Sequence, residues 1–257
     1  MSTELQNIEH LPFTLDGGVC HRAAIGLIVL ATDHTIEHEW RQMMRIDGVG
    51  LYESRLYNSA SITPETLAEM EKDIKGATAL IRPGVPMDVI AFGCTSGAMV
   101  IGEERVFERI REARPGIACT TPITAALAGL NALGTRRIAL LTPYVRSINE
   151  WMRGYIEERG ISVPVMGSFN HEDDNEVARI DSDSIARALM AVGASDKVDA
   201  VFVSCTSLRV AHLVESLEAR LGKPVLSSNH AMAWHSLRLA GIREPIPGWG
   251  RLFRCWG

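Results

Sequence analysis

The feature that most constrains the fold of this sequence is a repeated unit in which an apolar run ends at the tripeptide Cys-Thr-Ser. One copy is Cys94-Thr95-Ser96 and the other is Cys205-Thr206-Ser207. Each apolar run predicts a buried strand, and the segments that follow, 98–111 and 209–220, have helical character. Each thiol is therefore expected at a helix N-terminus, where backbone donors favour the thiolate. We interpret Cys94 and Cys205 as the two halves of one active site.

Apolar segments of strand length alternate with helical segments along most of the chain. The continuous apolar run 23–30 is typical of a buried parallel strand, and the segment 137–141 also predicts a strand. Both halves also repeat the order strand, Cys-Thr-Ser, helix, short strand and Ala-rich helix. The predicted fold is α/β, with two similar lobes related by a pseudo-twofold axis, each a parallel sheet flanked by helices. We assign residues 1–118 plus 226–257 to the first lobe and 119–225 to the second.

The polar residues at the strand ends predict where a ligand binds. Ligands of open α/β sheets lie beyond the carboxyl ends of the strands, so we expect the active site between the lobes. The hydroxyls of Thr95, Ser96, Thr206 and Ser207, with the amides of their turns, are candidates to hold a substrate carboxylate. Helix capping is the other duty of such hydroxyls, and it is compatible with anion binding because both use the same turn.

Several classes of function are disfavoured by the sequence. The net charge is -5 and Lys and Arg form no cluster, so nucleic-acid binding is not expected. Phosphate loops, HExxH pairs and GxSxG elbows are missing. Neither the segment 34–38 nor the segment 171–174 offers a complete metal-ligand set, so we expect no bound metal. Five cysteines without close pairs, and no apolar run of membrane-spanning length, predict a cytoplasmic protein with free thiols and no membrane partner.

These paired cysteine strand ends resemble the aspartate/glutamate racemase superfamily, from about residue 23 to residue 242. Within it the chain is most similar to the branch of maleate cis-trans isomerase, arylmalonate decarboxylase and the racemase-like proteins of ectoine utilisation. That branch carries a Tyr after a strand, matched here by Thr142-Pro143-Tyr144. Maleate isomerases carry an Asn in a loop before a helix, matched by Asn175. The resemblance implies a cofactor-independent enzyme that acts on a small carboxylate, with Tyr144 and Asn175 orienting it.

The sequence departs from the maleate isomerases at the end of the first strand. The isomerases have Ser-Asn-Thr-Thr-x-Glu, whereas this chain has Thr-Asp-His-Thr-Ile-Glu, which places Asp33 where the isomerases have Asn. A carboxylate there would repel a diacid and suits a substrate with an ammonium or amide N–H beside its reacting carbon. The alternative duty of Asp33 is to cap the helix that follows.

The resemblance leaves more than one activity open. The main prediction is a two-cysteine isomerase, either a racemase of an amino-acid derivative or a cis-trans isomerase of a small dicarboxylate. One alternative is an arylmalonate-type decarboxylase that uses only Cys205, although that enzyme has Gly where this chain has Cys94. Another is a non-catalytic protein that binds a small carboxylate. The aromatic tail 245–256 is expected either to pack on its own lobe or to form the subunit contact of a homo-oligomer.

Overall fold

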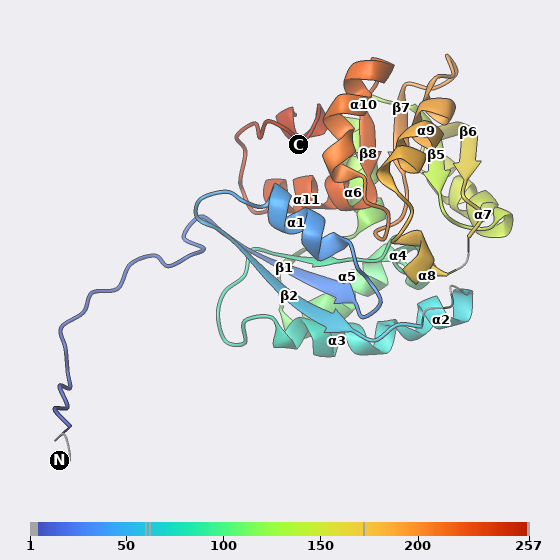
Figure 1. Ribbon diagram of the computed structural model, residues 1–257. Helices are drawn as coiled ribbons and strands as arrows, with labels where there is room; N and C mark the ends of the chain where they lie inside the picture. The colour runs from blue at the N-terminus through green and yellow to red at the C-terminus, as the bar shows by residue number, and fades with distance from the viewer. Residues whose placement is uncertain (1–4, 60, 62, 172, 256–257) are drawn as a thin grey trace.

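The computed structural model describes residues 5–59, 61, 63–171 and 173–255, and they form two parallel sheets (Figure 1). The first sheet has the order β2-β1-β3-β4 and the second has the order β6-β5-β7-β8. Each order is the same permutation of four strands in sequence, so the two sheets share one topology, and the predicted α/β fold is confirmed. The strands are β1 (Ala23–Leu30), β2 (Val49–Leu56), β3 (Val89–Phe92), β4 (Ala118–Thr120), β5 (Arg137–Thr142), β6 (Ser162–Ser168), β7 (Ala200–Val203) and β8 (Val225–Ser227).

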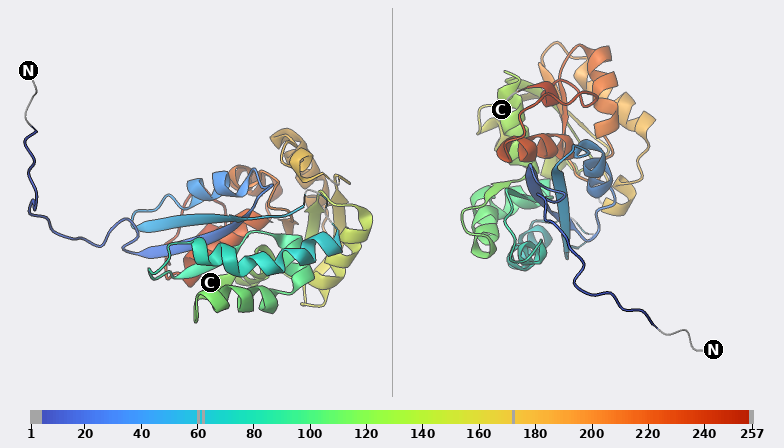
Figure 2. Two further views of the ribbon diagram at one scale, coloured as in Figure 1. Left: turned by 90° about the horizontal axis from the view of Figure 1, so that it is seen from below. Right: turned by 90° about the vertical axis from the view of Figure 1, so that its left-hand side faces the viewer.

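Helices cover both sheets and meet between them. α3 and α5 pack together on the first sheet, whereas α9 packs on β5 and β7 of the second. α11 packs on α6 and also contacts α1, β3 and β4, and the views of Figures 1 and 2 place it at the centre of the molecule. The helices are α1 (Ile36–Met43), α2 (Pro64–Glu69), α3 (Glu71–Leu80), α4 (Thr95–Ile101), α5 (Glu103–Ala113), α6 (Pro122–Ala132), α7 (Arg146–Glu157), α8 (Asp174–Val177), α9 (Ser182–Gly193), η1 (Ala211–Leu213), α10 (Val214–Leu221), α11 (Ser228–Leu239) and η2 (Leu252–Arg254).

Three of the four central strands are buried along their whole length. Every residue of β1, β3 and β7 is buried, because helices and the neighbouring lobe cover both faces of each sheet. Trp40 of α1 and Trp234 of α11 are among the largest fully buried side chains. No helix within the described ranges is long and apolar enough to span a membrane.

The boundary between the two lobes runs through short strands. β4, which spans residues 118–120, pairs with β3 in the first sheet. β8, which spans residues 225–227, pairs with β7 in the second. The division into 1–118 plus 226–257 and 119–225 remains a prediction, since α11 contacts elements of both sheets.

The two Cys-Thr-Ser turns continue differently, in contrast to the predicted symmetry. After Cys94 the helix α4 begins at once with Thr95 and ends at Gly102, whose φ of 92° suits a glycine. After Cys205 the predicted helix 209–220 is wrong in its start, because α10 begins only at Val214, after a short 3₁₀ turn. The segment 206–210 has no helical hydrogen bonds of its own.

The two ends of the chain differ in how they contact the lobes. Residues 5–22 form an arm without regular secondary structure that extends away from the two lobes (Figures 1 and 2). The tail packs back on α11, since the Trp234 indole donates to the Cys255 carbonyl at 3.3 Å and Phe253 is fully buried. Of the two expectations for the tail, packing on its own chain is the one observed for the described residues.

Candidate active site

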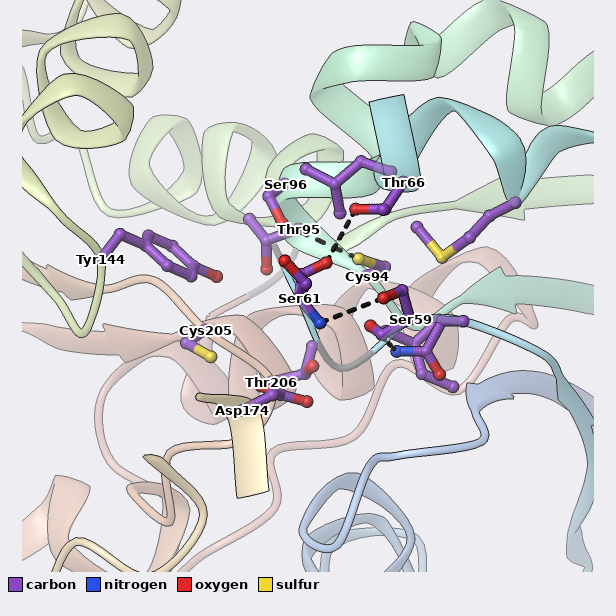
Figure 3. Close-up of a pocket in the computed structure, with 14 residues that line it drawn as sticks. Ser59, Ser61, Thr66, Cys94, Thr95, Ser96, Tyr144, Asp174, Cys205 and Thr206 are labelled. Atoms are coloured by element: carbon purple, nitrogen blue, oxygen red, sulfur yellow. Dashed lines mark hydrogen bonds between the residues drawn. The ribbon is translucent and has the colours of Figure 1, made fainter. Parts of the chain in front are cut away.

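Cys94 and Cys205 line one small cavity at the carboxyl ends of β3 and β7 (Figure 3). Their exposed fractions are 5% and 3%. The cavity has a volume of about 30 Å³, room for a water molecule or two, so the site is closed in this structure. Its lining residues are Leu30, Asn58, Ser59, Ser61, Thr66, Leu67, Met70, Cys94, Thr95, Ser96, Tyr144, Asp174, Cys205 and Thr206.

The Cys94 thiol is held at the start of α4. The amide of Gly97 donates to Cys94 Sγ at 3.3 Å, so the sulfur caps the helix. The turn lies close to the first sheet, because a Cβ on Gly93 would be 2.8 Å from the Ile28 carbonyl oxygen. A side chain at position 93 would therefore push the turn away from β1, and Gly93 fixes the height of Cys94 above the sheet.

The Cys205 thiol is held by a tighter turn. The amide of Ser207 donates to Cys205 Sγ at 3.4 Å. Figure 3 shows Tyr144, which follows β5, with its hydroxyl directed into the cavity on the side of Cys205. The Tyr144 ring is buried, and burial raises the pKa of its phenol well above 10, so Tyr144 is a neutral donor at the site.

Both thiols are protonated in the closed site. Burial raises the pKa of Cys94 to about 12, although the Gly97 amide lowers it. Burial also raises the pKa of Cys205 to about 12, and the nearby Asp174 carboxylate adds to the increase. The prediction that helix N-termini lower both pKa values is therefore wrong for this state, because loss of hydration outweighs the local donors. Cys205 also has no α-helix directly after it.

Asp174 is a carboxylate of the cavity that the sequence analysis did not identify. Its Oδ1 accepts from the Ser207 hydroxyl at 2.7 Å and its Oδ2 from the Thr32 hydroxyl at 3.1 Å. Asp173 caps α8 by accepting from the amides of residues 175 and 176, which directs Asp174 inward. The pair Asp173-Asp174 could have indicated this role in the sequence. When two Asp residues stand at the start of a helix and one caps it, the other is available for a different contact.

Asn175 does not reach the cavity. Its Oδ1 lies 2.9 Å from Nε2 of His34 in a partly exposed position. Successive side chains of a helix point about 100° apart, so the inward direction of Asp174 turns Asn175 away. The structure thus places a carboxylate, rather than the expected amide of Asn175, beside the thiols.

Asp33 lies behind the cavity wall. Its Oδ1 accepts from the amides of Thr35 and Ile36 at 2.7 and 2.8 Å, which is the capping duty considered as the alternative. Its Oδ2 has no hydrogen-bond partner among the described residues. Burial raises the pKa of Asp33 to about 6. Asp33 is therefore close enough to raise the pKa of both thiols, but it does not line the cavity.

Of the four hydroxyl residues predicted to bind the substrate, three line the cavity and one lies behind it. Thr95, Ser96 and Thr206 line the cavity, whereas Ser207 lies behind Asp174 and donates to it. Thr95 also lies 2.9 Å from the Ser228 hydroxyl at the start of α11. The sequence analysis therefore identified three cavity hydroxyls, and the fourth holds the missed carboxylate.

Three described residues that follow β2 in the first lobe, Asn58, Ser59 and Ser61, also line the cavity. Ser61 forms an isolated antiparallel bridge with Asp173, and the Thr66 hydroxyl donates to the Ser61 carbonyl at 2.7 Å. Asn58 donates to the Thr32 hydroxyl at 2.8 Å, which joins this loop to the partner of Asp174. The residues after β2 were not expected at the site, because their short polar run has no motif.

The charge and donor pattern limits what the cavity can bind. The described residues that line it include one carboxylate, Asp174, and no Lys, Arg or His. A substrate carboxylate would depend on hydroxyls and turn amides for its binding. No group of three or more His, Cys, Asp or Glu in the described parts of the chain is arranged to hold a metal ion.

Known proteins are similar to this chain in sequence and in fold. A family model described as arylmalonate decarboxylase matches residues 43–253. A maleate isomerase of Nocardia farcinica is 30% identical over 240 residues, covering 90% of this chain and 95% of the relative. An arylmalonate decarboxylase of Bordetella bronchiseptica is 34% identical over 199 residues, covering 75% and 82%.

Solved structures of the same two kinds of enzyme have folds similar to that of this chain. A maleate cis-trans isomerase of Nocardia farcinica with a covalently bound succinylcysteine intermediate has a TM-score of 0.81 at 28% identity, covering 90% of this chain and 98% of that one. An arylmalonate decarboxylase mutant in a liganded form has a TM-score of 0.77 at 28% identity, covering 90% and 98%. The chain belongs to the arylmalonate decarboxylase family.

Proposed function

We propose that the protein is a cofactor-independent isomerase of a small carboxylate, and that Cys94 and Cys205 carry the reaction. The observation that supports it most directly is that one thiol from each sheet lines the same closed cavity. The relative from Nocardia farcinica, with its succinylcysteine intermediate, shows that a cysteine of a similar fold forms a bond to a diacid carbon. The five free cysteines support a reducing, cytoplasmic location.

We assign the thiolate to Cys94 and the acid to Cys205. Cys94 Sγ already accepts from the Gly97 amide at the first turn of α4, and this contact stabilises a negative sulfur. The charge of Asp174 opposes ionisation of both thiols, but at Cys205 it is the largest influence on the pKa after burial, whereas at Cys94 the hydrogen bonds from Gly97 and Ser96 outweigh it. The pair exchanges one proton between two sulfurs, so the two titrations are coupled.

Cys94 and Cys205 can carry out either of two reactions that balance in atoms and electrons. In a racemisation, the Cys94 thiolate removes the proton beside the carboxylate, and Cys205 delivers a proton to the opposite face of the enediolate. In a cis-trans isomerisation, Cys94 forms a C–S bond to one alkene carbon and Cys205 protonates the other. Rotation about the new single bond then precedes elimination, which returns the proton to Cys205 and releases Cys94.

The hydroxyls of the cavity bind the substrate carboxylate in either reaction. Thr95, Ser96 and Thr206 line the cavity on both sides of the thiols, and Tyr144 supplies a neutral phenol. These donors also stabilise the charge that moves onto the carboxylate as the enediolate forms.

We infer that the substrate bears nitrogen beside its reacting carbon. Asp174 lines the cavity, Asp33 lies behind it, and no cationic side chain lines it among the described residues. Two like charges about 4 Å apart cost on the order of 4 kcal/mol at a moderate effective dielectric, so a diacid would be opposed by Asp174. An ammonium or amide N–H would be attracted to it.

Deuterium incorporation from solvent tests the proposed function. The protein is incubated in deuterated water with a panel of amino acids, N-acylated diamino acids and maleate, and the products are examined by mass spectrometry. Deuterium at the carbon beside a carboxylate, for a nitrogen-bearing substrate, is the expected result. Turnover of maleate alone would support an isomerase but refute the nitrogen-bearing substrate.

The product of the reaction distinguishes the decarboxylase alternative from the proposed isomerase. Release of carbon dioxide from an arylmalonate, with no deuterium exchange on the other substrates, would favour it and refute the isomerase. Binding without any turnover would favour a carboxylate-binding protein. Cys94 is the feature that disfavours both, since neither alternative needs a second thiol in the cavity.

A further inference from the structure

The backbone that follows Cys205 is held by side chains instead of a helix. The hydroxyl of Thr35 donates to the Ser207 carbonyl at 2.8 Å. The amides of Val210 and Ala211 find no helical carbonyl, because they lie at the N-terminus of the short 3₁₀ helix η1, where the first amides have no acceptor within the helix. A buried turn of this kind depends on its outside partners for its shape.

Glu39 of α1 supplies the acceptor for both amides. Its Oε1 accepts from the amides of Val210 and Ala211, each at 2.7 Å. The side chain comes from the first lobe and is 3% exposed. When Glu39 is ionised, its hydrogen bonds with the two amides are charge-assisted, which is the stronger kind.

Asn229 of α11 extends this contact to the catalytic turn. Its Nδ2 donates to Glu39 Oε2 at 2.8 Å and to the Thr206 carbonyl at 2.7 Å. Its Oδ1 has no partner among the described residues, so the two donated bonds fix how the amide group is turned. The Trp40 indole donates to the Asn229 carbonyl at 3.1 Å and holds the helix at this height.

We propose that Glu39 is a positioning residue for Cys205, acting through the amides of Val210 and Ala211 and through Asn229 on Thr206. The proposal rests on the catalytic role of Cys205 proposed above. Glu39 touches neither the cavity nor the thiol, so its effect is on where the turn places the sulfur. Displacing a reacting group by about 1 Å costs on the order of 100-fold in rate.

The charged groups around Glu39 do not neutralise it. His38, Arg209 and His212 line the same surface hollow as Glu39 but none makes an ion pair with it among the described residues. Asp33 is the nearby carboxylate, and it adds to the effect of burial, which raises the pKa of Glu39 to about 7. The carboxylate is therefore held by neutral donors alone, and these donors are the ones that define the turn.

The test compares Glu39→Gln with Glu218→Gln. The glutamine keeps an acceptor for the two amides but directs an NH₂ group at the NH₂ group of Asn229, which must turn and release the Thr206 carbonyl. Glu218 is a matched control, because it is 4% exposed and accepts from the amides of Val225 and Arg251 at 2.9 and 2.7 Å, away from the cavity. Both variants lose a buried carboxylate that orders backbone.

Two measurements are made on each protein. The first is kcat and KM for the substrate found by deuterium incorporation. The second is the rate at which iodoacetamide labels Cys205 relative to Cys94, followed by peptide mass spectrometry, which needs no substrate. We expect Glu39→Gln to lower kcat by roughly 10- to 100-fold with KM within about threefold, and to change the labelling ratio several-fold. Glu218→Gln should leave both unchanged.

Each outcome decides the proposal. Equal kcat and equal labelling ratios in the two glutamine variants would overturn it. If wild-type protein shows no turnover, the proposed function fails, and the labelling ratio alone still tests the positioning of Cys205. If Glu39→Gln does not fold, Glu39→Asp keeps the charge but withdraws the carboxylate by one methylene. A wild-type kcat or labelling ratio in Glu39→Asp would then overturn the proposal.

Discussion

The Ser207 hydroxyl donates to Asp174 Oδ1 at 2.7 Å and so connects the Cys205 turn to the start of α8. Because of this bond, a carboxylate lies beside both thiols, and its charge raises the pKa of each. The acidity of the two cavity thiols is therefore set partly by a residue outside both Cys-Thr-Ser units.

Removing either thiol should abolish turnover. We expect Cys94→Ala and Cys205→Ala each to lower kcat by 10²-fold or more, since each thiol acts as acid, base or nucleophile. Cys119→Ala is the control, because Cys119 is a buried residue of β4 outside the cavity. Wild-type kcat in either cavity variant would contradict the two-thiol mechanism.

Asp174→Asn should make both thiols more acidic. Loss of the nearby charge lowers the pKa of Cys94 and Cys205, so iodoacetamide labels both faster at fixed pH. Activity on a nitrogen-bearing substrate should fall, with the larger effect on KM. Slower labelling of the two thiols would contradict this role of Asp174.

Asn175→Ala should leave turnover within about twofold of the wild type, because Asn175 contacts His34 and not the cavity. The sequence resemblance predicts the opposite, a loss of substrate orientation. Steady-state kinetics on the two proteins separates these expectations. A large rise in KM of Asn175→Ala would contradict this prediction and show that Asn175 helps to bind the substrate.

Alkylation should begin at Cys20. The helix argument predicts that Cys94 and Cys205 react first, whereas burial raises the pKa of both to about 12. Cys20 is partly exposed, the Arg82 guanidinium donates to its sulfur at 3.1 Å, and its pKa is lowered, chiefly by Tyr52. Time-resolved labelling of the substrate-free protein checks the order, and Arg82→Leu should slow Cys20 alone.

The free energy of unfolding should depend on Asp33 in acid. Its pKa is raised from 3.8 to about 6 in the folded protein, so the folded state binds the proton more tightly. Its contribution is full below pH 3.8 and is lost as the pH rises to about 6, which amounts to about 3 kcal/mol. Urea unfolding of Asp33→Asn at pH 4 and pH 7 should lack this change. An identical pH dependence in the variant and the wild type would show that Asp33 is not the group responsible.

The sequence predicted the sheets and the thiols better than the surroundings of the thiols. Buried parallel strands are continuous apolar runs, and Cys94 and Cys205 follow two of them directly, so local pattern was sufficient. Asp174 could not be distinguished from Asn175, because one residue of register at a helix start decides which side chain enters the cavity. The role of Glu39 depends on contacts with residues 171 or more positions away, which leave no local signal.

The raised thiol pKa values and the small closed cavity imply a protein that resists oxidative damage while it is idle. Peroxide attacks thiolates that it can reach, whereas the sulfurs of Cys94 and Cys205 are buried and protonated. A substrate larger than the cavity of about 30 Å³ has to displace lining residues before it reaches the sulfurs. Inactivation by peroxide should accordingly be slow without substrate and accelerate during turnover, so that the working enzyme ages faster than the stored one.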